Sequence, residues 1–197
     1  MRKKIAKYHP LTQFHDVSSE DIYIADFSRR TNGARSVEVH TAKPLDPNGV
    51  DEMDCLHLKN EKLLTVEVSV FDDDMFHDAQ GNNIEHCECC LYPLPSSNKK
   101  WIAFVELKDC NDNNVLGYKQ KMQRQIFEAC SALRGIGIPC KNAYGLVSCP
   151  RRKTGFNDNL FYSPLELINL KRMTSIDFIV TNNGIIVDET TIRPVLR

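Results

Sequence analysis

Hydrophobic residues gather in short, unbroken runs through the middle of the chain. The strongest run, Trp101-Ile-Ala-Phe-Val-Glu-Leu107, has the length and the aromatic and β-branched residues of a buried strand. Segments 63–71 and 85–93 have the same character, and residues typical of turns separate each segment from the next. The pattern predicts three sequential strands, arranged as an antiparallel meander.

A helix is predicted directly after these strands. Between residues 115 and 134, apolar side chains recur at helical spacing, and Gly135, Gly137 and Pro139 end the pattern. Residues 142–148 then indicate another strand. Because a helical crossover connects this strand to the one before it, we expect the two to be parallel.

The flanking segments carry weaker patterns. Strands are predicted at 21–27 and 36–40, whereas residues 50–64 fit either a helix or a strand. Pro164 to Met173 is predicted to be a helix whose Leu165, Ile168 and Met173 pack inward. The Asn183-Gly184 pair between Ile176–Val180 and Ile185–Val187 predicts a β-hairpin.

These elements predict an α+β fold with an α/β-like core, in which helices flank a mixed central sheet. The length, 197 residues, suits one domain over 1–197. We divide it into a core at 63–150, an N-terminal β-rich extension at 1–62, and a C-terminal helix plus hairpin at 151–197.

Composition narrows the class of protein. With 42% hydrophobic and 26% charged residues the chain is typical of globular proteins. Its first residues lack the apolar stretch of a signal peptide, and no apolar run is long enough to span a bilayer. We therefore expect a soluble cytoplasmic protein with no membrane partner. Its eight cysteines are expected to be mostly small buried side chains rather than disulfides or a zinc site.

Charge is distributed unevenly along the chain. Residues 44–98 are rich in acids, and residues 99–153 are rich in Lys and Arg. A basic face for phosphate groups beside an acidic pocket fits this pattern, although charge runs are also common on ordinary solvated surfaces. The nucleic-acid-binding candidates are Lys99, Lys100, Lys119, Lys121, Gln123, Arg124, Arg151, Arg152 and Lys153.

Candidate chemistry stands at the end of the strongest strand. Side chains alternate along a strand, so Glu106 and Lys108 share one face. Glu88, in the preceding strand, would lie across from them in an antiparallel hairpin. Buried charge is costly unless it is paired or binds a metal ion, so these residues form either a structural ion pair or a metal site.

The order of an acid, a hairpin, Glu-x-Lys and a helix resembles the core of the PD-(D/E)XK, or restriction-endonuclease-like, nuclease superfamily over roughly residues 63 to 150. The resemblance implies that Glu88, Glu106 and the main-chain carbonyl of Leu107 bind Mg²⁺ or Mn²⁺. It also implies that Lys108 assists the water that attacks the phosphate. Two features depart from the pattern: Glu88 stands where the family usually has Asp, and no Pro precedes it.

Three functions remain open from the sequence. The leading one is a metal-dependent nuclease acting on DNA or RNA. Such a nuclease could act as a monomer or as a homodimer. The second is a non-catalytic nucleic-acid-binding or assembly protein with a degenerate site on the same fold. The third is an unrelated α+β domain whose Glu-x-Lys is accidental. If Glu88 is not the first acid, Glu67 on the adjoining strand is the next candidate.

Overall fold

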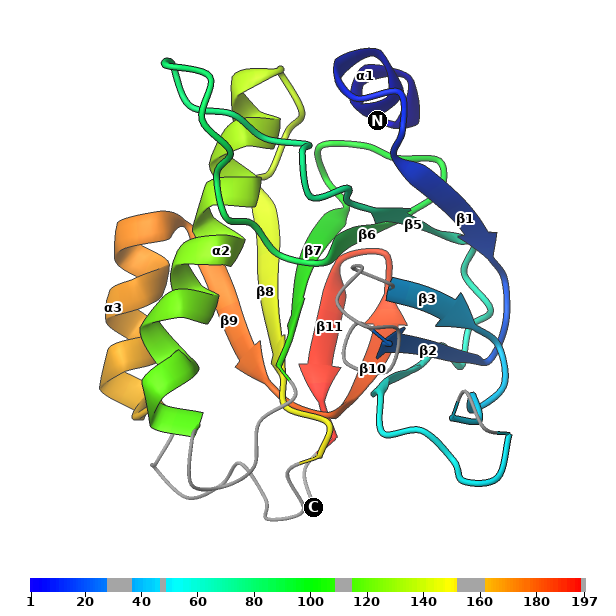
Figure 1. Cartoon of the computed structure of the whole chain (residues 1–197). Coiled ribbons are helices and arrows are strands. Elements are labelled where there is room, and N and C mark those ends of the chain that lie inside the picture. The colour runs from blue at the N-terminus through cyan, green and yellow to red at the C-terminus, as the bar shows by residue number, and fades with distance from the viewer. Residues whose placement is uncertain (28–36, 47–48, 109–114, 152–161, 196–197) are drawn as a thin grey trace.

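The computed structural model describes residues 1–27, 37–46, 49–108, 115–151 and 162–195. Figure 1 shows an α+β fold with two mixed sheets and helices α1 (Arg2–Tyr8), α2 (Val115–Gly135) and α3 (Pro164–Thr174). In the part of the chain that is described, no helix is long and apolar enough to cross a membrane. The predicted fold class is confirmed at this level.

Sheet A carries the predicted core. Its strands lie in the order β1, β5, β6, β7, β8, β9. They are β1 (Gln13–Val17), β5 (Val66–Val70), β6 (Cys89–Pro93), β7 (Trp101–Leu107), β8 (Asn142–Ser148) and β9 (Ile176–Val180). Antiparallel pairing joins β1 through β7, and parallel pairing joins β7, β8 and β9. The predicted meander and the parallel crossover through α2 are therefore confirmed.

Sheet B combines strands from the two ends of the chain. Its order is β11, β10, β4, β2, β3. They are β2 (Asp21–Asp26), β3 (Val37–His40), β4 (Leu56–Lys59), β10 (Asn183–Asp188) and β11 (Thr191–Pro194). The parallel β4–β10 pair joins the N-terminal extension to the C-terminal segment. The ambiguous stretch at 50–64 thus contains a strand.

Two hydrophobic layers enclose sheet A. On one face, Phe104 packs in a cluster with Met122 and Ile126 of α2. On the other face, Val105 packs in a cluster with Ile24 of sheet B. Figure 1 shows α2 and α3 together on one side of the molecule. Because both faces are covered, every residue of β7 is buried, which explains the unbroken apolar run in the sequence.

The predicted hairpin at residues 176–187 is wrong. β9 pairs with β8 in sheet A, whereas β10 pairs with β4 and β11 in sheet B. Asn182 lies between β9 and β10, where the chain passes from sheet A to sheet B. Its side chain bonds the backbone of Cys149: it accepts from Cys149 N at 3.0 Å and donates to Cys149 O at 2.8 Å. Gly184 lies inside β10, where a Cβ would come within 2.8 Å of Leu58.

The predicted inward face of α3 is also wrong. Leu165, Ile168 and Met173 are all exposed. The side chains that pack against the core are Leu167 and Leu170, which are partly buried. The predicted residues lie on the solvent side of the helix.

Candidate active site

Pairing of β6 with β7 brings Glu88 and Glu106 together. Cys89 pairs with Val105 and Cys90 with Phe104, so Glu88, which directly precedes β6, lies near the end of β7 that carries Glu106. The amide of Glu88 donates to the carbonyl of Val105 at 2.9 Å, although Val105 is already opposite Cys89, so the regular ladder ends at Cys89. Strand alternation places the Glu106 side chain on the same side as Phe104, the side that α2 covers. Simple alternation does not extend back through Glu88, because Cys87 and Cys90 belong to the same core cluster.

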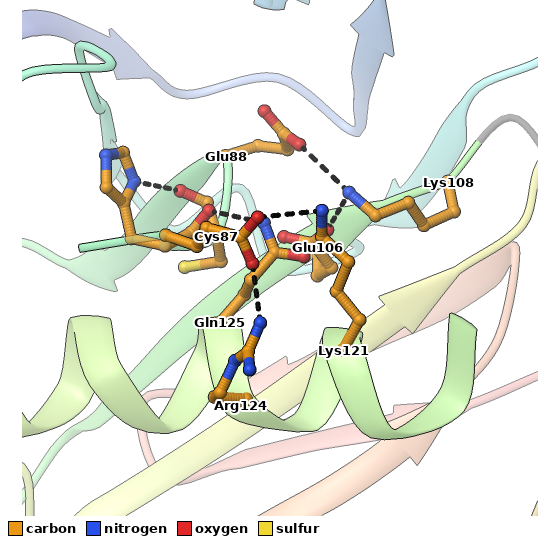
Figure 2. Close-up of polar contacts among 9 residues, drawn as sticks. Cys87, Glu88, Glu106, Lys108, Lys121, Arg124 and Gln125 are labelled. Carbon is orange, nitrogen blue, oxygen red and sulfur yellow. Dashed lines mark hydrogen bonds and ion pairs between the residues drawn. The ribbon is translucent and has the colours of Figure 1, made fainter. Parts of the chain in front are cut away.

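One ammonium group faces both carboxylates, as Figure 2 shows. Nζ of Lys108 contacts Oε1 of Glu106 and lies 4.0 Å from Oε1 of Glu88. Glu106 is fully buried and Glu88 nearly so, whereas 19% of the Lys108 side chain is exposed. Carboxylates held this close repel each other unless a cation or a proton lies between them. Carboxylate oxygens that converge in this way are the kind of ligand that a divalent cation binds.

Leu107, the predicted carbonyl ligand, is the last residue of β7. It pairs with Ser148 of β8, and the next amide, that of Lys108, donates to the Ser148 carbonyl at 2.9 Å. This parallel pairing anchors the end of β7 against its neighbour. The predicted bond from the Leu107 carbonyl to a metal ion stays a prediction.

Gln125 of α2 is a site residue that sequence reasoning missed. Its Nε2 donates to the carbonyl of His86 at 3.0 Å. A carbonyl only accepts, so this bond fixes the amide orientation. Oε1 is buried, and within the described residues no donor contacts it. Gln125 lies three residues after Met122 and four before Ala129, both buried, so the helical period could have revealed it.

The predicted helix residue, Gln123, lies elsewhere. It is partly exposed and lines a surface pocket between α2 and α3, together with Glu166 and Leu170. The structure therefore places Gln125, rather than Gln123, on the side of α2 that faces Glu88. The expected role of Gln123 in nucleic-acid binding stays a prediction.

A pocket of about 300 Å³ opens beside Glu88. Its walls come from the segment before β6 and from α2, and its lining residues are Asp73, Asn83, Ile84, Glu85, His86, Glu88 and Gln125. Glu85 accepts from Lys121 at 2.9 Å and from Arg124 at 2.7 Å. These two hydrogen bonds hold the pKa of Glu85 below its ordinary value. The pocket is thus lined both by Glu88 and by Glu85, the carboxylate that two cations of α2 contact.

Three of the predicted basic residues lie toward the end of β7 that carries Glu106. Lys121 and Arg124 reach the pocket through Glu85. Arg151 follows β8, which ends beside β7 because the two strands are parallel. Arg152 and Lys153 lie outside the described residues.

The other basic candidates point elsewhere. Lys99 and Lys100 precede β7 and so lie at the strand end opposite Glu106, where Lys100 pairs with Glu189 at 3.0 Å. Lys119 faces α3, pairing with Glu166 at 2.5 Å. The basic stretch of the sequence is therefore divided among separate places on the molecule.

Glu67, the alternative first acid, lies away from Glu106. It pairs with Tyr92 in the β5–β6 ladder, four residues from Glu88, or about 13 Å along the strand. Tyr92 Oη donates to its carboxylate, and Arg2 Nε lies 3.5 Å away. Burial raises its pKa above the ordinary value. These partners tie Glu67 to the N-terminal helix rather than to the candidate site.

No protein-family model, curated protein or solved structure matches this chain. Membership in the PD-(D/E)XK superfamily therefore stays a prediction carried by the Glu88, Glu106 and Lys108 pattern. Across the described residues, no group of three or more His, Cys, Asp or Glu side chains is arranged to hold a metal ion. A metal site here would need ligands of other kinds beside the two glutamates.

Proposed function

We propose that this protein is a metal-dependent nuclease that hydrolyses phosphodiester bonds in DNA or RNA. One observation carries the proposal: Glu88, directly before β6, and Glu106, at the end of β7, are two buried carboxylates that both lie within reach of the Lys108 ammonium. Burying carboxylates is costly for folding. Two buried carboxylates that converge with a lysine are an arrangement that suits the binding of a divalent cation.

The oxygen atoms at this site suit Mg²⁺ or Mn²⁺. Glu88 and Glu106 would hold the ion, with the Leu107 carbonyl as the ligand that the family resemblance implies. The buried Oε1 of Gln125, which no donor contacts within the described residues, supplies a further oxygen of the kind these ions bind. A bound ion of this class polarises a phosphate and lowers the pKa of its water.

Lys108 would assist the reaction beside the metal ion. The Lys108 side chain is 19% exposed, more than that of Glu88 or Glu106, and its ammonium lies within reach of both carboxylates. There it would orient the attacking water or offset the negative charge that develops on the phosphate. The buried carboxylates would hold that ammonium in place.

A second candidate function is a non-catalytic nucleic-acid-binding or assembly protein. The contact between Lys108 and Glu106 favours it, because this ion pair already neutralises one of the two carboxylates. In that case the site would serve the fold, and nucleic acid would bind at the surface. Binding without metal-dependent cleavage would identify this function.

Cleavage of labelled nucleic acid tests the proposal. Single- and double-stranded DNA and RNA would be incubated with the parent protein in Mg²⁺ or Mn²⁺ and in a chelator. The Glu106→Gln variant tests the site, and Glu166→Gln, which alters an exposed acid on α3, is the control. We expect metal-dependent cleavage by the parent and the control alone. Equal cleavage by Glu106→Gln, or none by any protein, would contradict the proposal.

A further inference from the structure

Two cations of α2 converge on one carboxylate. Lys121 and Arg124 are three residues apart and so lie on neighbouring positions of the helix surface. Nζ of Lys121 lies 2.9 Å from Oε1 of Glu85, and Nη2 of Arg124 lies 2.7 Å from Oε2 (Figure 2). Each carboxylate oxygen thus receives one cation. A phosphate group presents similar paired oxygens, and Lys and Arg are its usual partners.

This cation pair adjoins the candidate active site. Glu85 lines the same pocket as Glu88, and the three-residue separation limits their Cα distance to about 11 Å. Gln125, which follows Arg124 directly, lines that pocket as well. An anion held by the two cations would therefore lie next to the carboxylates at which we propose cleavage.

The contacts made by Glu85 are of a kind that a substrate can displace. The exposed fractions of the Glu85, Lys121 and Arg124 side chains are 50%, 43% and 61%. Exposed ion pairs contribute little to folding stability because water competes for both partners. Exchanging Glu85 for another anion would therefore cost the fold little. Glu106, which is fully buried, offers no such exchange.

We propose that Lys121 and Arg124 bind the phosphate adjacent to the one that is cleaved, and that Glu85 occupies this subsite until nucleic acid displaces it. The inference rests on the proposed function. It makes Glu85 an internal competitor that weakens the binding of nucleic acid. Removing its charge should tighten binding rather than weaken it.

The chain offers a matched control on the same helix. Lys119 pairs with Glu166 at 2.5 Å, but it faces α3. Glu166→Gln releases a lysine with the same change in net charge as Glu85→Gln. The substitution also keeps the helix cap, because Gln can replace Glu in the capping box with Ser163.

Fluorescence anisotropy of a labelled single-stranded oligonucleotide, in chelator so that no cleavage occurs, measures the effect. We expect Glu85→Gln to bind roughly three- to tenfold more tightly than the parent, and Glu166→Gln to bind within about twofold of it. Adding Lys121→Met and Arg124→Met to Glu85→Gln should abolish the gain. Because the two cations share one phosphate, these two substitutions should also reduce the slope of log affinity against log salt by about 0.7. Glu85→Ala should reproduce the result of Glu85→Gln.

Each other outcome overturns the inference in a recognisable way. If the parent cleaves nucleic acid but Glu85→Gln binds no more tightly than it does, the subsite assignment is wrong and the proposed function stands. The same holds if Glu166→Gln shows an equal gain, since net charge alone then explains the effect. If neither the parent nor any variant binds the oligonucleotide, both the inference and the proposed function are wrong.

Discussion

Removing Lys108 and removing the charge of Glu106 should affect stability very differently. Lys108→Met keeps much of the aliphatic stem but takes the ammonium away from a fully buried carboxylate. Glu106→Gln removes the buried charge instead and leaves an ammonium whose side chain is 19% exposed and can reach water. The two halves of one ion pair are therefore not equivalent.

The magnitude follows from the burial of Glu106. Breaking a buried ion pair by removing one partner costs about 3–5 kcal/mol, and we expect about 3 kcal/mol for Lys108→Met because Lys108 is partly exposed. For a domain of this size that corresponds to a fall in Tm of roughly 6–12 °C. Glu106→Gln should change the free energy of unfolding by less than about 1 kcal/mol.

Thermal unfolding followed by circular dichroism, with and without Mn²⁺, is the assay. A divalent cation can replace the lost ammonium between Glu88 and Glu106, so Mn²⁺ should restore part of the Tm of Lys108→Met. It should have little effect on Glu106→Gln. Equal destabilisation by both substitutions, or a Lys108→Met protein as stable as the parent, would refute the reasoning.

Three further predictions address the fold and the site. Gly145→Ala should lower the free energy of unfolding in urea by about 1–3 kcal/mol, because a Cβ would lie 3.0 Å from the Phe178 ring; an unchanged value would contradict this close packing. Burial raises the pKa of Glu67, so the folded state holds the proton of this carboxyl group more tightly than the unfolded state does. The contribution of Glu67 to stability therefore falls as pH rises above the ordinary carboxyl pKa. Glu67→Gln should therefore make urea stability between about pH 4 and pH 7 decline less than in the parent, and a steeper decline would reverse the assigned sign. Glu88→Asp should retain part of any Mn²⁺-dependent cleavage and Glu88→Ala none, and full activity in Glu88→Ala would remove Glu88 from the site.

The central strands could be predicted because the signals there are local. The unbroken apolar run at Trp101–Leu107 reflects a strand covered on both faces, and the short loop before it specifies an antiparallel neighbour. Strand alternation also places Glu106 on the face of Phe104. It does not place Glu88, which directly precedes β6, where Cys87 and Cys90 lie in one core cluster and regular alternation ends.

Sheet B and the end of β9 could not be predicted in this way. β4 and β10 are far apart in the sequence, and no local pattern encodes their pairing. The Asn183-Gly184 pair indicated a turn, but the Asn182 side chain bonds the backbone of Cys149 and leads the chain into the other sheet. Tertiary contacts decided the outcome at both places.

The basic surface shows how a charge run in sequence differs from one in space. Lys100 directly precedes β7, whereas Glu106 lies near the end of that strand. About 20 Å of strand separates the two residues, so Lys100 is distant from the carboxylates. Lys119 and Lys121 share a helix but pair with different segments, Lys119 with Glu166 and Lys121 with Glu85. Which acid each lysine reaches depends on packing that the sequence pattern does not contain.

Calorimetric titration of the protein with Mn²⁺ tests the central claim most directly, because that claim is a divalent metal site built from Glu88 and Glu106. We expect the parent to bind one Mn²⁺ ion, and Glu88→Ala and Glu106→Gln each to lose that binding while unfolding at temperatures close to that of the parent. Binding by Glu88→Ala and Glu106→Gln as strong as that of the parent, or no binding by the parent, would contradict the account.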